Sequence, residues 1–153
     1  MPFIYRVTKA TRPVFDGTGA FLEGGRWNSP GRNVIYASTC LAGSLLELLV
    51  HTGMRQKLPG KHHCARAEIP DDLPIEHVDE TRLPGWDATD SVVARKLGDE
   101  WIATSRTAVL SVPAVTAKPY GRNLVLNADH PEFKRIRIGD GVPIEWDARL
   151  LRA

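Results

Sequence analysis

Short runs of β-branched, aromatic and apolar residues, separated by turn-forming residues, predict a protein built mainly from strands. The predicted strands are residues 3–8, 33–38, 63–70, 108–115, 122–128, 133–139 and 142–150. Glycine-rich residues 11–32 and proline-rich residues 70–89 are expected to be loops. Because strands follow one another with few helices between them, the order predicts an α+β fold with mixed, mostly antiparallel split sheets.

Two segments predict helices. Residues 40–52 form the first, capped by Ser38 or Thr39 and ended by Gly53, and residues 90–104 form the second. The first is apolar around most of its circumference, which is typical of a buried helix.

One carboxylate interrupts this apolar helix. Gly43, Glu47 and His51 recur at intervals of four residues and therefore share one face. A small residue, a carboxylate and an imidazole on one face predict the wall of a pocket. The alternative is a structural Glu47, which pairs with an arginine or His51 or points to solvent.

The stretch GGRWNSPG, residues 24–31, holds Arg26 between glycines, where a backbone can approach a ligand closely. An arginine fork suits a phosphate or pyrophosphate, but it can equally hold a loop by binding backbone carbonyls. Tyr36 lies on the strand that leads into the first helix, as a core residue or as a platform for a ligand. Asn123, at the start of a later strand, is either a turn residue or a residue whose side-chain amide binds a ligand.

Composition narrows the function classes. The chain has 153 residues, of which 42% are hydrophobic and 25% charged, with a net charge of +2. These values predict one globular domain over residues 1–153, with no preference for nucleic acid. The absence of a signal peptide and of an apolar run of about 20 residues predicts a cytoplasmic location and no membrane contact.

No metal site is predicted. His62, His63 and Cys64 are contiguous on a predicted strand, so adjacent side chains point to opposite faces. Cys40 lies in an apolar stretch and is expected to be a small buried side chain. The sequence also lacks a P-loop, a dinucleotide-binding glycine fingerprint and a nucleophile elbow.

Taken together, these motifs resemble the RES domain, a family named for its arginine, glutamate and serine. The resemblance spans nearly the whole chain and is carried by GGRWNSPG, VIYAS, LLELLVH, LGDEW, VPA, NLVLNADHPEF and EWDARL. It implies an ADP-ribosyltransferase-like fold, the activity of a toxin from a type II toxin–antitoxin system, and NAD+ as the substrate. It also implies a cognate antitoxin with an Xre-like helix-turn-helix region as the partner.

The same resemblance assigns residues. The implied catalytic residues are Arg26, Tyr36 and Glu47, and the implied cofactor-binding residues are Arg26, Tyr36, Ser38, His51 and Asn123. One position departs from the family, which commonly has serine where this chain has Ala114. Either Ser111 supplies the missing hydroxyl, or that contact is dispensable.

The chemistry of NAD+ cleavage fits these residues. Departure of nicotinamide leaves oxocarbenium-like charge on the ribose, which a carboxylate stabilises most in the transition state. Glu47 is expected to supply it, Arg26 to anchor the phosphates or ribose, and Tyr36 to pack against the nicotinamide. The acceptor of ADP-ribose stays open between water, phosphate and a host protein. A non-catalytic binding module is the remaining alternative.

Overall fold

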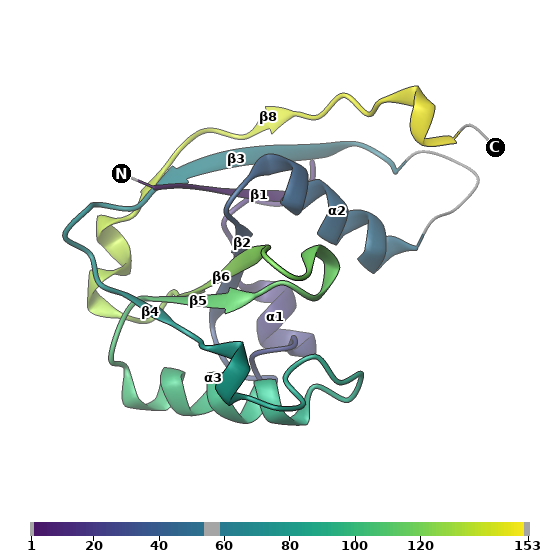
Figure 1. Ribbon diagram of the computed structural model, residues 1–153. Helices are drawn as coiled ribbons and strands as arrows, with labels where there is room; N and C mark the ends of the chain where they lie inside the picture. Colours follow the sequence, from purple (N-terminus) through teal and green to yellow (C-terminus); the bar gives the residue numbers. More distant parts are fainter. Residues whose placement is uncertain (1, 54–58, 152–153) are drawn as a thin grey trace.

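The computed structural model describes residues 2–53 and 59–151, and within them eight strands form one sheet (Figure 1). The strand order is β4-β5-β6-β2-β1-β3-β7, and β8 also pairs with β3. The strands are β1 (Phe3–Lys9), β2 (Val34–Ser38), β3 (His62–Glu68), β4 (Ile75–His77), β5 (Val109–Pro113), β6 (Arg122–Asn127), β7 (Arg137–Ile138) and β8 (Val142–Pro143). Apart from the parallel pair β4–β5, the pairs described are antiparallel, which confirms the predicted fold class.

Helices are short and few. The α-helices are α1 (Thr18–Glu23), α2 (Leu41–Thr52) and α3 (Val92–Thr104), and the 3-10 helices are η1 (Glu80–Arg82), η2 (Val115–Ala117), η3 (Pro131–Arg135) and η4 (Ala148–Leu151). The two predicted helices are thus confirmed. The loop prediction for residues 11–32 missed α1, and the one for residues 70–89 missed β4 and η1. Of the strand predicted over residues 133–139, only Arg137–Ile138 is a strand (β7), because residues 133–135 belong to the 3-10 helix that begins at Pro131.

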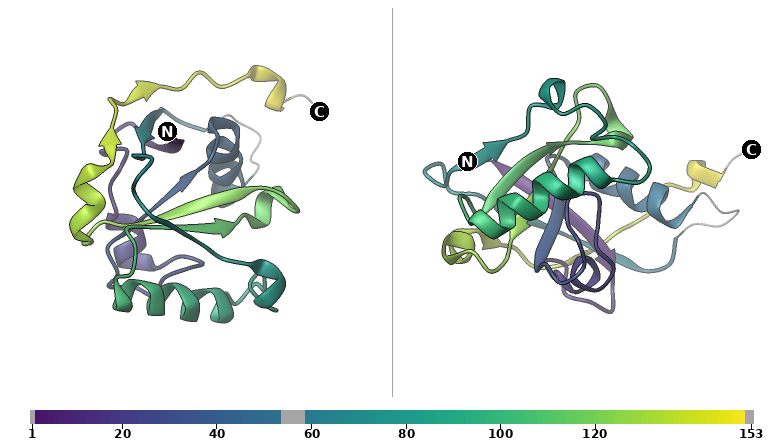
Figure 2. Two further views of the ribbon diagram at one scale, coloured as in Figure 1. Left: turned by 60° about the vertical axis from the view of Figure 1, so that its left-hand side comes forward. Right: turned by 90° about the horizontal axis from the view of Figure 1, so that it is seen from below.

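The sheet is split between β1 and β2. The register pairs these strands only at Tyr5 and Ser38, whereas β1 pairs with β3 along its whole length. One half of the sheet therefore consists of β4, β5, β6 and β2, and the other of β1, β3, β7 and β8. The predicted split is confirmed, and the views in Figure 2 show the two halves turning away from each other.

A half-buried arginine lies beside this split. The guanidinium of Arg6 donates from Nε to the Val14 carbonyl at 2.7 Å, from Nη1 to the Tyr36 carbonyl at 2.6 Å, and from Nη2 to the Asp16 carbonyl at 3.4 Å. Burial lowers the pKa of this guanidinium, and the charge of Asp16 opposes that shift. Arg6 of β1 therefore satisfies the Tyr36 carbonyl of β2, on the other side of the split, and two carbonyls of the loop before α1.

Replacing Arg6 with methionine is expected to lower the free energy of unfolding by about 3 kcal/mol, because three carbonyls lose a charged donor. Urea denaturation monitored by circular dichroism measures the change. Arg12→Met is the matched control, since Arg12 is exposed and a surface change of this kind is expected to cost under about 0.5 kcal/mol. Equal midpoints for the two variants would show that Arg6 does not hold the split.

Strand alternation creates two cores on opposite faces of the first half-sheet. The core between the two halves contains Ile4, Ile35, Ala67, Ile69, Val109, Leu124 and Leu126. The core on the other face contains Trp27, Val34, Trp86, Ala94, Trp101, Leu110, Val112 and Val125. α3 covers this second face (Figure 2). Tyr36, Ser38 and Asn123 share it, because they alternate with the residues of the first core.

The expectation of a buried α2 is wrong. The Ser44 hydroxyl donates to the Tyr5 carbonyl at 2.7 Å and fixes the helix to β1, and among the residues of α2 only Ser44 is buried. Leu46 and Val50 are 40% and 59% exposed. Leucine content predicted burial on all sides, but α2 packs on β1 and β2 with one stripe of its surface, and the rest is exposed.

The capping predictions also need correction. Cys40, not Ser38 or Thr39, caps α2: its Sγ accepts from the Gly43 backbone N–H at 3.3 Å. Cys40 is exposed, so the expectation of a buried cysteine is wrong. The first backbone N–H groups of a helix have no partner within the helix. The Cys40 side chain therefore acts as a hydrogen-bond acceptor at this end, although it is largely apolar.

Candidate functional site

Glu47 is the centre of a small polar group. Its half-buried side chain accepts at Oε1 from Thr116 Oγ1 at 2.6 Å and from Asn123 Nδ2 at 2.8 Å. Asn123 Oδ1 in turn accepts from Ser38 Oγ at 3.0 Å. The structure therefore brings together Glu47, Ser38 and Asn123, three of the predicted residues. Thr116 joins them without having been predicted.

The face of α2 that carries Glu47 turns toward β2. A Cβ added at Gly43 would lie 3.4 Å from Ser38 Cβ, so the helix and the strand nearly touch there. Glu47 follows one turn later, above Asn123. Gly43 and Glu47 thus both turn toward β2, whereas His51 is exposed, and within the described residues neither His51 nor an arginine pairs with Glu47.

Tyr36 fixes the loop that carries Arg26. Its hydroxyl donates to Asn28 Oδ1 at 2.6 Å and accepts from the Trp27 backbone N–H at 3.0 Å. A Cβ at Gly25 would lie 2.6 Å from this hydroxyl, so only glycine fits. Burial raises the pKa of the Tyr36 phenol far above its usual value, against the opposing effects of the Trp27 N–H and the Arg26 charge. The phenol is therefore neutral near pH 7.

Arg26 lies beside Tyr36 and joins two loops. Its Nη1 donates to the Trp86 carbonyl at 3.2 Å and to the Ala88 carbonyl at 2.8 Å. In this structure Arg26 thus holds a loop through backbone carbonyls, as one of its two sequence-based interpretations predicted. Its Nε and Nη2 make no hydrogen bond with the described part of the chain, which leaves one edge of the fork for a ligand.

Aromatic and charged residues close the side of the site next to Arg26. Trp86 stacks on Trp27, with ring centroids 6.4 Å apart and planes 20° apart. The Lys118 ammonium lies 5.5 Å from the Trp86 ring centroid and forms an ion pair with Asp87. The segment around Trp86 is therefore held against the connection between η2 and β6, and these two elements carry the partners of Glu47.

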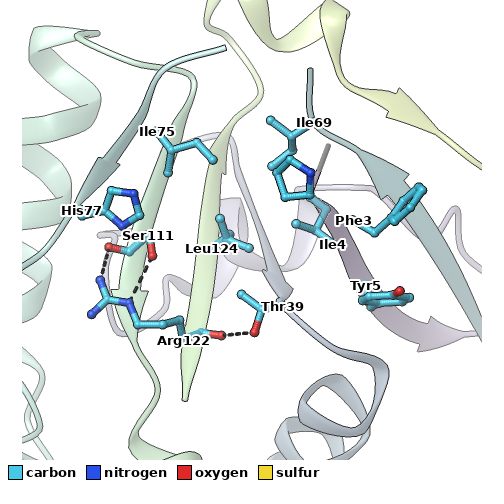
Figure 3. Close-up of a pocket in the computed structure, with 11 residues that line it drawn as sticks. Phe3, Ile4, Tyr5, Thr39, Ile69, Ile75, His77, Ser111, Arg122 and Leu124 are labelled. Carbon is cyan, nitrogen blue, oxygen red and sulfur yellow. Dashed lines mark hydrogen bonds between the residues drawn. The ribbon is translucent and has the colours of Figure 1, made fainter. Parts of the chain in front are cut away.

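A separate pocket lies on the opposite face of β6. It has a volume of about 660 Å³ and is lined mainly by apolar side chains with His77, Ser111 and Arg122 (Figure 3). The Arg122 guanidinium is occupied there, donating to Ser111 Oγ at 3.1 Å and to Glu80 Oε2 at 2.9 Å. Because neighbouring residues of a strand face opposite sides, this pocket is not the space beside Glu47.

A family model described as the RES domain matches residues 3–147. The chain belongs to the RES domain family. This RES domain is 35% identical over 140 residues to the Prs ADP-ribosylating toxin of Sphingobium sp. (strain YBL2), covering 89% of this chain and 86% of that protein. It is 33% identical over 155 aligned positions to Toxin Res of Photorhabdus laumondii, covering 98% of this chain and 97% of that protein.

The fold of this RES domain also recurs in a solved structure. A chain of the M. tuberculosis MbcT–MbcA toxin–antitoxin complex superposes with a TM-score of 0.73 at 17% sequence identity. The match covers 93% of this chain and 83% of that one, so the two share a fold.

Among the residues that the structure describes, no three His, Cys, Asp or Glu side chains gather as a metal site would require. Over the same residues, no helix is long and apolar enough to cross a bilayer.

Proposed function

We propose that this RES domain is the toxin of a toxin–antitoxin pair and cleaves the nicotinamide–ribose bond of NAD+. The observation that carries the proposal is the carboxylate of Glu47. Both donors bind its Oε1, and within the described chain Oε2 accepts no hydrogen bond. One oxygen is thus fixed by the protein and the other is left for a substrate hydroxyl.

This arrangement suits a cationic transition state. As nicotinamide leaves, positive charge develops on the ribose, and a carboxylate held beside it binds the transition state more tightly than the substrate. Glu47 Oε2 would accept from a ribose hydroxyl and face the developing charge. The free edge of Arg26 would bind the phosphates, and the neutral ring of Tyr36 would pack near the nicotinamide. His51, which is exposed, keeps only a peripheral role in this proposal.

A second candidate function differs in the acceptor. ADP-ribose passes to water or phosphate when NAD+ is degraded, or to a side chain of a host protein when the chain is a mono-ADP-ribosyltransferase. The name of the Sphingobium relative, an ADP-ribosylating toxin, supports transfer to a protein. The toxin–antitoxin complex of the structural neighbour supports a cognate antitoxin as the partner, and we propose an Xre-like one.

Purified chain incubated with NAD+ tests the function. Nicotinamide release is followed by chromatography with and without phosphate and with cell lysate, and intact masses of lysate proteins are recorded. Release without protein modification supports hydrolysis or phosphorolysis, and a mass gain of one ADP-ribose on a lysate protein supports transfer. If no nicotinamide is released under any of these conditions, the chain is a non-catalytic binding module and the proposed function is wrong.

A further inference from the structure

The hydroxyl that the sequence lacks at Ala114 is present nearby on a different residue. Ala114 is buried and its backbone N–H donates to the Gly121 carbonyl at 2.9 Å. Ser111 cannot replace it, because its buried hydroxyl accepts from Arg122 on the opposite face of the sheet. Thr116, two residues after Ala114, instead places its Oγ1 2.6 Å from Glu47 Oε1.

The turn that carries Thr116 is closely fixed. The Ala117 N–H donates to the Ala114 carbonyl at 3.2 Å, and the Gly121 N–H donates to the Ala117 carbonyl at 2.7 Å. A Cβ at Gly121 would lie 2.3 Å from Ala117 Cβ, so the turn closes directly on the start of β6. Threonine is stiff at χ1, and a fixed backbone therefore fixes the direction of its hydroxyl.

We propose that Thr116 is a positioning residue that, together with Asn123, orients the Glu47 carboxylate for NAD+ cleavage. This inference rests on the proposed function. A glutamate side chain in water samples many rotamers, and ordering it costs up to about 2 kcal/mol. The two donors to Oε1 order the Glu47 side chain before NAD+ binds. Oε2 is then available to accept a hydrogen bond from a ribose hydroxyl.

The assignment predicts a specific kinetic signature. Thr116 donates to Glu47 and acts through it in this proposal, so its loss is expected to affect the transition state more than substrate binding. Thr116→Val keeps the shape of the side chain and removes the donor. It is expected to lower kcat for nicotinamide release by roughly 10- to 100-fold and to change KM for NAD+ by less than about twofold.

Thr116→Ser retains the hydroxyl and is expected to keep most of the parental kcat. Thr8→Val, a matched change on β1, is expected to leave both constants unchanged and to unfold at the parental temperature. Parental kcat in Thr116→Val, or an equal loss in the valine and serine variants, would overturn the assignment. If the parent and Thr8→Val release no nicotinamide, the proposed function fails, and the role of Thr116 falls with it.

Discussion

Glu47→Gln is expected to lower kcat for nicotinamide release by about 1000-fold, the loss typical for removing one preorganised electrostatic group. The amide oxygen can still accept from Thr116 and Asn123, so the local hydrogen bonds and the fold are expected to persist. The amide carries no charge, however, and cannot stabilise the cation that develops on the ribose. Chromatography of nicotinamide in samples quenched at timed intervals measures the effect.

Glu23→Gln is the matched control for this experiment. Glu23 ends α1 and is exposed, and its neutralisation changes the net charge of the chain by the same amount. The control is expected to turn over NAD+ at the parental rate. If Glu47→Gln does the same while both variants melt like the parent, Glu47 is not the catalytic carboxylate.

Gly98→Ala is expected to lower the free energy of unfolding by about 4 kcal/mol, at the upper end of the range for overpacked sites. A Cβ at Gly98 on α3 would lie 1.7 Å from the Trp27 carbonyl oxygen and 2.7 Å from its carbon. Helix and loop backbones are in direct contact here, so no side-chain rotation can make room. Either α3 or the loop that carries Arg26 must move away.

Gly19→Ala provides a control with the opposite sign. Gly19 lies within α1, and a Cβ there would meet open space. Alanine in place of this glycine in the first turn of α1 is expected to stabilise the chain by up to about 0.5 kcal/mol. Urea denaturation of both variants measures the difference. A Gly98→Ala midpoint close to the parental one would mean that the contact with Trp27 is not tight in solution.

Local sequence patterns predicted those parts of the fold that local chemistry determines. The strand over residues 33–38 and the helix over residues 40–52 were confirmed, because periodicity and the terminating Gly53 act within a few residues. α1 was missed, because six residues with Gly17 at the cap position carry no such signal. Burial of α2 was overestimated, because its leucine content says nothing of how much sheet is available to cover it.

At the candidate site, the sequence predicted individual residues but not which of them contact one another. Glu47, Ser38 and Asn123 were each predicted as contacts for a ligand, yet here Ser38 and Asn123 bind to one another and Asn123 binds to Glu47. Thr116 carried no sequence signal, since its contact with Glu47 exists only because η2 and α2 meet in space. The interpretation of Arg26 as a loop-holding residue needed the positions of the Trp86 and Ala88 carbonyls, 60 and 62 residues away.

The split of the sheet has a consequence for the geometry of Glu47. Glu47 belongs to a helix fastened to β1 through Ser44, but both of its own partners belong to the half of the molecule on the other side of the split. The hydrogen bonds of the Glu47 carboxylate therefore depend on the separation of the two halves of the sheet. Warming that loosens the divide around Arg6 is expected to switch turnover off at temperatures where the chain is still folded. The hydrophobic core between the two halves also holds them together, so the thermal tolerance of turnover is expected to depend on this core as well as on the contacts of Arg6.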